Sequence, residues 1–189
     1  MAVLNVHSRR LPAAAEQVGV LLDSLASPAD RLWPHQTWPS MRFDRPLEVG
    51  AVGGHGPIRY RIEAYLPGRW IRFRFTAPRG FDGFHEYIVR ESSDGHATLQ
   101  HLCTMRLRGS ARLTWPLFYR PLHDALIEDS IDLAEWAATA ASQPTGRWTY
   151  QVRLLRALSG RIRRRAARGH SQHLTPPIDG GDPKSAKRH

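Results

Sequence analysis

The sequence has 189 residues and a formal net charge of +10, and hydrophobic residues make up 41% of it. This length fits one domain with an extension, and the apolar content excludes a chain that is disordered throughout. The charge is uneven, because residues 1–141 contain 16 Arg against 15 Asp and Glu, whereas residues 142–189 contain 11 Arg and Lys against two Asp. The basic character belongs to the C-terminal segment, so it does not indicate a nucleic-acid-binding domain, and nucleic acid is not an expected partner.

Cys103 is the one cysteine of the sequence, so no intramolecular disulfide can form and the fold does not depend on an oxidising compartment. The first eleven residues lack the pattern of a signal peptide, and no stretch is apolar for long enough to span a bilayer. We therefore expect a cytoplasmic protein.

The N-terminal part of the chain combines extended and helical patterns. Residues 2–11 predict a short strand, and Pro12 opens a helix to about residue 26, with apolar residues at helical spacing. Residues 28–40 contain three prolines together with Trp33 and Trp38. This composition fits either a second short helix or a loop anchored by aromatic side chains.

From residue 41 the period changes to the alternation of strands. The pattern predicts strands at residues 41–49, 58–66, 70–77, 84–90 and 96–113. The turns between them are short, which indicates antiparallel pairing, because parallel strands need long crossovers. The glycines between the first two of these strands predict a mobile hairpin at the mouth of a cavity. Trp33, Trp38 and Phe81 either line this mouth or pack against the sheet. These glycines are Gly50, Gly53, Gly54 and Gly56.

Residues 122–140 predict a long amphipathic helix, with one apolar stripe and an acidic side formed by Asp124, Glu128, Asp132 and Glu135. Such a helix packs its apolar stripe on a sheet. The order of strand, short helix, about six further antiparallel strands and long helix predicts an α+β domain over residues 1–141.

Several stretches resemble the START/birch-pollen-allergen superfamily, specifically its polyketide cyclase/dehydrase and lipid-transport (SRPBCC) group. They are Arg42-Phe-Asp-Arg-Pro-Leu47, Tyr65-Leu-Pro-Gly-Arg69, Ile71-Arg-Phe-Arg-Phe75, Gly80-Phe-Asp-Gly83 and Arg120-Pro-Leu-His-Asp124. The resemblance implies a helix-grip fold, in which a curved antiparallel sheet of about six to seven strands wraps a long C-terminal helix and leaves a cavity. It further implies a hydrophobic ligand, aromatic or lipid-like, although fold membership alone does not establish catalysis.

Strand alternation selects the residues that face this interior. On residues 84–90, either the set containing His85 and Tyr87 or the set containing Phe84 and Glu86 can face the interior. We favour the first, because it buries an aromatic and a β-branched residue and exposes Glu86. The same reasoning places His101 inside, together with Cys103, which we interpret as a small hydrophobe. The expected cavity lining is Tyr60, Ile71, Phe73, Phe75, Met105, Trp115 and Leu126.

Asp129 is exceptional among the acids of the last helix, because it lies within the apolar stripe. A carboxylate there needs a partner, and the candidates are His85, His101, Tyr60 and Tyr87. A carboxylate that orients an imidazole suits acid–base catalysis, so His85, His101, Asp129 and Tyr87 form the candidate catalytic set. The alternative is that the two histidines are hydrogen-bonded core residues and that Asp129 is structural.

No metal site and no cofactor are expected. The histidines His7, His35, His55, His96 and His123 show no metal-ligand spacing. The glycines of residues 50–56 precede a strand, whereas a dinucleotide-binding turn precedes a helix.

Residues 142–168 predict a basic amphipathic helix, and residues 169–189 have the composition of a disordered tail. Such a helix can lie on an anionic membrane surface, contact nucleic-acid phosphates or pack its apolar stripe on the domain. The residues expected at an anionic surface are Trp148, Arg153, Arg161, Arg164 and Arg168.

Three functions follow from these patterns. The first is binding of a hydrophobic small molecule in the cavity. The second is an enzyme similar to polyketide cyclases and dehydrases that uses His and Asp acid–base chemistry. The third is a protein that acts at a membrane surface, or on a partner, through its basic segment, which would make it peripheral to the membrane.

Overall fold

The computed structural model describes residues 1–139 and 148–171, with side chains described up to Gly160. Seven strands form one antiparallel sheet in the order β1-β7-β6-β5-β4-β3-β2. The strands are β1 (Ala2–Leu11), β2 (Arg42–Phe43), β3 (Val52–His55), β4 (Ile58–Leu66), β5 (Trp70–Ala77), β6 (Phe81–Glu91) and β7 (Ala97–Leu107). The helices are α1 (Ala15–Asp23), α2 (Ala111–Thr114), the π-helix η1 (Trp115–Tyr119), α3 (Arg120–Thr139) and α4 (Tyr150–Ser171).

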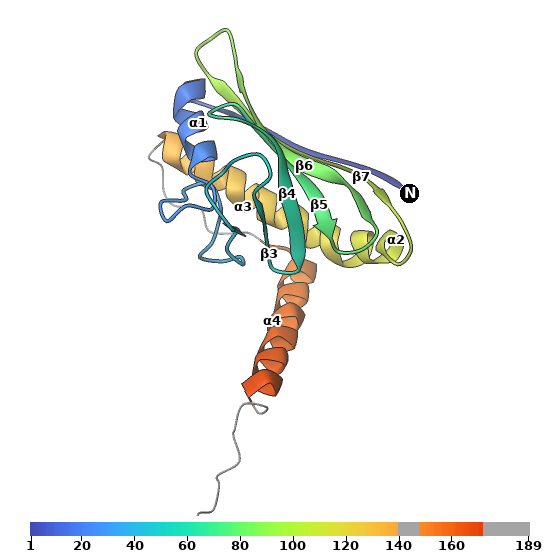
Figure 1. Ribbon diagram of the computed structural model, residues 1–189. Coiled ribbons are helices and arrows are strands. Elements are labelled where there is room, and N and C mark those ends of the chain that lie inside the picture. The colour runs from blue at the N-terminus through green and yellow to red at the C-terminus, as the bar shows by residue number, and fades with distance from the viewer. Residues whose placement is uncertain (140–147, 172–189) are drawn as a thin grey trace, which may run out of the picture.

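The sheet is curved, and α3 lies across its concave face with α1 beside it (Figure 1). The N-terminal strand β1 forms one edge of the sheet. It pairs with β7 over its whole length, from Ala2 opposite Arg106 to Leu11 opposite Ala97. This architecture confirms the predicted α+β helix-grip fold.

The alternation predicted for the two central strands is confirmed. On β6, His85, Tyr87 and Val89 are buried, and on β7 every second residue from Leu99 to Leu107 is buried. These side chains face α1 and α3, so they form the core between sheet and helices.

The prediction that Glu86 is exposed is wrong. Glu86 lies on the outer face of the sheet, yet its side chain is only 7% exposed, because Trp70 and Arg72 cover it. The Trp70 Nε1 and Arg72 Nε atoms both donate to Glu86 Oε2, at 2.8 and 2.7 Å. The Arg72 guanidinium also lies over the Phe84 ring, 3.9 Å from its centroid, so the ion pair is partly withdrawn from water.

The strand predicted at residues 41–49 is much shorter in the structure, and the glycine segment after it is not a loose hairpin. Only Arg42 and Phe43 form β2, and Gly53 and Gly54 lie within β3, opposite them. A Cβ on Gly53 would lie 2.1 Å from the carbonyl oxygen of Arg42. Gly53 and Gly54 therefore allow neighbouring backbones to approach closely, which sequence alone does not distinguish from flexibility.

The last strand and last helix also differ from the predicted bounds. The strand ends at Leu107, where 113 was expected, and the helix begins at Ala111, ahead of the expected residue 122. Pro116 interrupts the α-helical ladder, because it has no N–H to donate, and the chain forms the π-helix η1 before α3. The predicted break at Trp115-Pro116 is thus a distortion inside a helix.

Residues 28–40 form the predicted aromatic-anchored loop, and no helix is assigned to them. Trp33 is buried, and its Nε1 atom donates to the Pro39 carbonyl at 2.9 Å. Asp30 holds the start of the loop by accepting hydrogen bonds from the backbone N–H groups of Leu32 and Trp33.

The helix α4 projects away from the sheet and docks at its first turns (Figure 1). None of the described helices is long and apolar enough to cross a membrane. The predicted disordered tail begins at residue 169, and its residues 172–189 lie outside the described part of the chain.

Candidate functional site

The interior between the sheet and α3 contains a row of imidazoles, which we call the imidazole row and which comprises His85, His101 and His123. The ring centroids of His85 and His101 are 5.4 Å apart, and those of His101 and His123 are 5.1 Å apart. Strands β6 and β7 supply the first two rings from neighbouring inward positions, and α3 supplies the third. Three histidines, far apart in the sequence, thus form one polar group inside an apolar core.

The first two rings of the row are joined directly. Nδ1 of His85 lies 3.2 Å from Nε2 of His101, within hydrogen-bond distance. Burial lowers the pKa of both imidazoles well below the ordinary histidine value, with a smaller contribution from the nearby His123. Both rings are therefore neutral near pH 7, so each has one N–H donor and one acceptor nitrogen.

Four buried polar atoms at this site have no hydrogen-bond partner among the described residues. They are Tyr60 Oη, His85 Nε2, His101 Nδ1 and His123 Nε2. Because the His85–His101 bond uses one donor and one acceptor, the pair keeps one free donor and one free acceptor in either tautomeric arrangement. Buried polar atoms without partners are uncommon, so a cluster of them indicates a place where another molecule completes the hydrogen bonds.

The walls of the site are aromatic. The rings of Phe73 and Phe75 stack against His85, at centroid distances of 4.9 and 5.1 Å, and Tyr60 meets it edge-on at 4.9 Å. Phe75 is only half-buried, and its ring contacts Phe81, which in turn contacts Tyr119 on η1. These ring contacts connect the interior to the surface.

The structure places the residues predicted to line a cavity in this core. Six of the seven are buried: Tyr60, Ile71, Phe73, Met105, Trp115 and Leu126. Phe75 is the seventh. A hollow with a volume of about 550 Å³ lies elsewhere, between α3 and the start of α4. Its lining includes four carboxylates, Asp124, Glu128, Asp129 and Asp132, so it is a surface groove of acidic character.

The candidate catalytic set is only partly brought together. His85 and His101 contact each other, and the ring of Tyr87 meets His101 edge-on at 4.7 Å. The Tyr87 hydroxyl, however, is 2.9 Å from Ser130 Oγ, which donates to the Leu32 carbonyl at 2.8 Å. Tyr87 therefore ties β6 to α3 and to the loop before β2, and burial raises the pKa of its hydroxyl.

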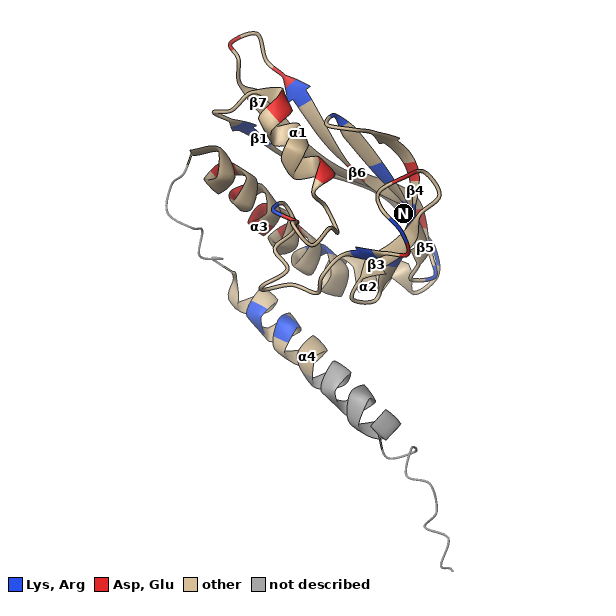
Figure 2. Ribbon diagram, turned by 60° about the vertical axis from the view of Figure 1, so that its left-hand side comes forward, with Lys and Arg blue, Asp and Glu red and all other residues tan. Residues whose placement is uncertain are grey.

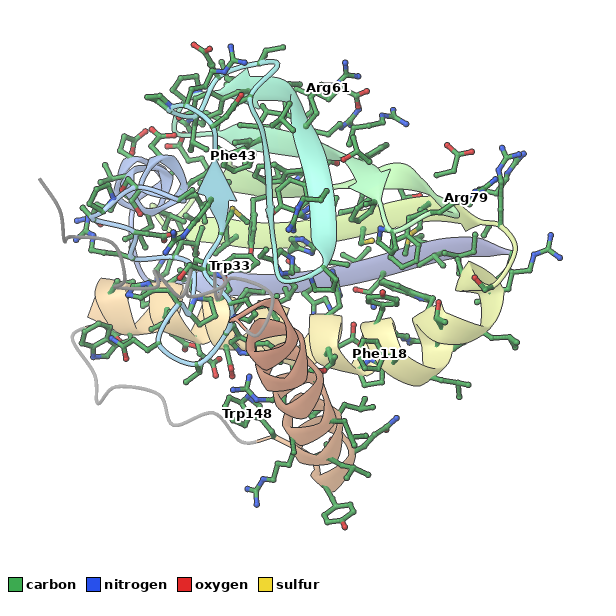
Figure 3. The ribbon with its side chains drawn as sticks, turned by 60° about the horizontal axis from the view of Figure 1, so that its bottom comes forward. Trp33, Phe43, Arg61, Arg79, Phe118 and Trp148 are labelled. Atoms are coloured by element: carbon green, nitrogen blue, oxygen red, sulfur yellow. The ribbon has the colours of Figure 1, made fainter. Side chains whose placement is uncertain are left out.

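The expectation that Asp129 pairs with an interior histidine or tyrosine is wrong. Its Oδ2 atom accepts hydrogen bonds from two indoles, Trp38 Nε1 at 2.7 Å and Trp148 Nε1 at 2.9 Å. Figure 3 shows Trp148 at the start of α4, on the side of α3 away from the sheet. Asp129 therefore anchors α4, and the imidazole row has no carboxylate from this residue.

The same contact changes the interpretation of the basic segment. Trp148, expected at a membrane surface, packs on the domain with Trp38, and Arg156 lies over both indole rings at 4.2 and 3.8 Å from their centroids. Val152, in the same stripe, is buried. Arg153 is exposed, whereas the side chains of Arg161, Arg164 and Arg168 lie outside the described part. The first turns of α4 thus pack their apolar stripe on the domain, and Figure 2 shows that these turns also contain basic residues.

Cys103 is buried on β7, and burial raises the pKa of its thiol to about 12. It is the small hydrophobe expected from the sequence. Sequence reasoning missed Ser130 and His123. The sequence places His123 next to Asp124 on the predicted helix. It does not show that His123 points inward, because that depends on how α3 is rotated about its axis after η1.

No family model matches the sequence, and no curated protein matches it closely enough to count as a relative. Solved structures are similar in fold. A protein from Thermobifida fusca is 15% identical with a TM-score of 0.56, and the match covers 75% of this chain and 97% of that one. CalU16 from Micromonospora echinospora is 12% identical with a TM-score of 0.53, covering 85% of both chains.

A point mutant of norcoclaurine synthase from Thalictrum flavum, solved in complex with a transition state analogue, is 12% identical with a TM-score of 0.54. The match covers 72% of this chain and 94% of that one. At these identities the comparisons concern the fold. This chain shares a helix-grip fold with these solved structures.

Proposed function

We propose that this protein binds a hydrophobic small molecule with at least one polar group between the sheet and α3. The observation that carries the proposal is the cluster of four unpartnered buried atoms on Tyr60, His85, His101 and His123. Burial raises the pKa of the Tyr60 hydroxyl, so it remains a donor. A carbonyl or hydroxyl oxygen on the ligand would satisfy this hydroxyl and the free donor of the His85–His101 pair.

The aromatic walls support a flat, partly aromatic ligand. Phe73 and Phe75 already stack on His85 at interplanar angles of 28° and 23°. An aromatic ring of a ligand could stack against these side chains in the same way. The half-buried Phe75 and Tyr119 flank the buried Phe81 at one end of the site, and a ligand that enters there replaces the contacts among these rings. The solved norcoclaurine synthase complex holds a transition state analogue, which supports this fold as a small-molecule binder.

Binding is favoured over acid–base catalysis by two features of the site. A general base works best with a pKa near the working pH, whereas burial lowers the pKa of His85 and His101 well below that. Asp129, the expected orienting carboxylate, is engaged by Trp38 and Trp148. A cyclase- or dehydrase-like reaction would therefore have to rely on neutral imidazoles alone.

Native mass spectrometry of the protein purified from its own host tests the proposal, because a retained molecule identifies the ligand class. The affinity of that molecule is then compared in Tyr60→Phe and in the matched control Tyr65→Phe, whose hydroxyl donates to Asp23 Oδ1. We expect Tyr60→Phe to weaken binding about tenfold, as for the loss of one hydrogen bond, and Tyr65→Phe to leave it unchanged. Absence of a retained molecule, or equal affinities, would count against the proposal.

A second proposal concerns the basic segment, which we infer contacts an anionic membrane surface. It is supported by the excess of basic residues over 142–189 and by two exposed leucines of α4, Leu154 and Leu158, beside the exposed Arg153. Co-sedimentation with phosphatidylserine vesicles tests it by comparing the unsubstituted chain with a charge-depleted variant. In this variant four arginines are replaced by glutamine: Arg161→Gln, Arg163→Gln, Arg164→Gln and Arg165→Gln. Equal sedimentation of both chains would remove the proposal.

A further inference from the structure

Two histidines and a carboxylate converge where β1 passes the start of α3. His7 Nε2, His123 Nδ1 and Asp124 Oδ1 all lie within 4.8 Å of one another. We propose that these three residues bind a divalent first-row transition-metal cation, with zinc as the cation that suits them. Two imidazole nitrogens and one carboxylate oxygen are a donor set that such cations prefer over calcium or magnesium.

The spacing of the three atoms fits a metal better than it fits direct hydrogen bonds. His7 Nε2 and His123 Nδ1 are each 3.3 Å from Asp124 Oδ1. Charge-assisted hydrogen bonds are usually shorter, at about 2.8 Å. Ligand atoms arranged tetrahedrally around zinc lie about 3.4 Å apart, given its bond lengths of about 2.1 Å. Both contacts to Asp124 therefore already have the separation that coordination requires.

The opposite nitrogen of His7 supports the same interpretation. His7 Nδ1 lies 2.6 Å from Glu128 Oε1, one turn further along α3. A carboxylate that accepts the second ring N–H of a histidine fixes the tautomer in which the other nitrogen has a free lone pair. Glu128 therefore orients His7 with Nε2 toward Asp124.

Asn5 supplies an independent observation. Its Nδ2 atom donates to Asp124 Oδ1 at 2.9 Å, whereas its Oδ1 atom is buried and has no hydrogen-bond partner among the described residues. A half-turn of the amide about its last side-chain bond exchanges the two atoms and directs the oxygen at the site. Asn5 can thus provide a fourth ligand, an amide oxygen.

The charges around the site favour a cation. Two arginines pair with the acids of the site: Arg120 Nε lies 3.6 Å from Asp124 Oδ2, and Arg9 contacts Glu128 at 2.8 Å. Further acids of the same helix side, Asp132 and Glu135, also pair with Arg9, so the carboxylates outnumber the arginines. Asp124 and Glu128 also line the acidic groove between α3 and α4, which gives a solvated cation a route to the site. His7 and His123 are mostly buried, with side chains 13% and 16% exposed, so the bound ion would be held between strand and helix.

Binding would have two consequences for the rest of the molecule. The cation would join the N-terminal strand to α3, which are more than 110 residues apart in the sequence. Coordination through Nδ1 of His123 would also fix its proton on Nε2, the buried atom of the imidazole row that lacks a partner. An occupied site would therefore present a donor to the interior.

Titration of the full chain with Zn²⁺, followed by calorimetry, tests the site, and the visible absorption of bound Co²⁺ reports its coordination. We expect one tight site per chain. His7→Gln and Asp124→Asn should each weaken binding at least 100-fold, and Glu128→Gln 10- to 100-fold, since it acts through His7. The matched control is His96→Ala, because His96 also lies beside a carboxylate, with its Nδ1 atom 3.3 Å from Asp94 Oδ1, but on an exposed turn.

His96→Ala should bind Zn²⁺ with unchanged affinity. Unchanged affinity of His7→Gln and Asp124→Asn would overturn the proposal, since the ions would then bind other histidines. The test does not depend on the variants folding, because imidazole NMR signals can be followed in the unsubstituted chain. Zn²⁺ should shift the signals of His7 and His123 at one equivalent and leave that of His96 in place, and the reverse pattern would overturn the proposal.

Discussion

The imidazole of His85 is hydrogen-bonded to that of His101, with 3.2 Å between Nδ1 of the first and Nε2 of the second. This bond lies inside an apolar core, where His101 has no solvent exposure and His85 has 5%. A bond between two neutral imidazoles leaves each ring with one unused nitrogen. The pair is therefore stable in the core only while uncharged, and it is suited to hydrogen-bond a third polar group.

The first prediction is that the free energy of unfolding falls as the pH is lowered below about 6.5. Desolvation, with the nearby His123 and His55, lowers the pKa of His85 in the folded chain, so below the ordinary histidine pKa the unfolded chain binds the additional proton. Stability is then lost at up to about 1.4 kcal/mol per pH unit for such a group. Urea unfolding between pH 5 and 8 should show a shallower slope for His85→Phe, and an identical slope would contradict the assignment.

The second prediction compares two ion pairs on the outer face of the sheet. Glu86 accepts hydrogen bonds from Trp70 and Arg72 and is 7% exposed, whereas Glu63 pairs with Arg74 and is 29% exposed. Glu86→Ala should destabilise by about 2 kcal/mol, because it leaves the partly buried donors of Trp70 and Arg72 without their acceptor. Glu63→Ala should cost less than about 1 kcal/mol, as is usual for exposed pairs. Thermal unfolding measures both, and equal losses would refute the assigned difference in burial.

The third prediction concerns the docking of α4. Asp129→Ala removes the acceptor shared by the indoles of Trp38 and Trp148, so it should release the first turns of α4 and cost about 2 kcal/mol. Hydrogen exchange of residues 150–156 should become faster. Asp82→Ala is the control, because Asp82 pairs with Arg108 at an exposed position. Unchanged protection in Asp129→Ala would mean that the contact does not hold α4.

The fourth prediction compares two helical glycines. Alanine normally stabilises a helix relative to glycine by about 1 kcal/mol. At Gly160 in α4 a Cβ meets open space, whereas at Gly19 in α1 it would lie 2.5 Å from the carbonyl oxygen of Gly68. Gly160→Ala should therefore raise the helicity of α4, and Gly19→Ala should lower the stability of the domain. Far-UV circular dichroism and urea unfolding separate the two effects, and a stabilising Gly19→Ala would contradict the close packing of α1 on the β4–β5 turn.

Much of the fold could be predicted because alternation and turn residues are local signals. The inward positions of His85 and His101 followed from the period of two along β6 and β7. The burial of Glu86 could not follow from that period, since it depends on Trp70 and Arg72 from the neighbouring strand. Gly53 showed the same limit, because a glycine that permits close approach and one that permits flexibility look alike in sequence.

The candidate site was less predictable, because its contacts link distant segments. The predicted apolar stripe of the last helix is wrong in its orientation, because the buried face of α3 consists of Leu126, Ile127, Ser130, Ile131 and Ala134. Asp129 lies off this face, and its partners come from a loop and from the segment just before α4, 91 and 19 residues away. His7 and His123 meet only because β1 pairs with β7 beside α3. Neither relationship has a spacing that a motif could reveal.

The central claim is that the unpartnered atoms of the imidazole row receive a ligand. Side-chain ¹H–¹⁵N NMR of the histidines tests this most directly, using the molecule that purifies with the protein or, failing that, 1-anilinonaphthalene-8-sulfonate as a hydrophobic probe. We expect the signals of His85 and His101 to shift on binding and that of His96 to stay in place. Binding with unchanged His85 and His101 signals would place the ligand elsewhere and contradict the proposed site.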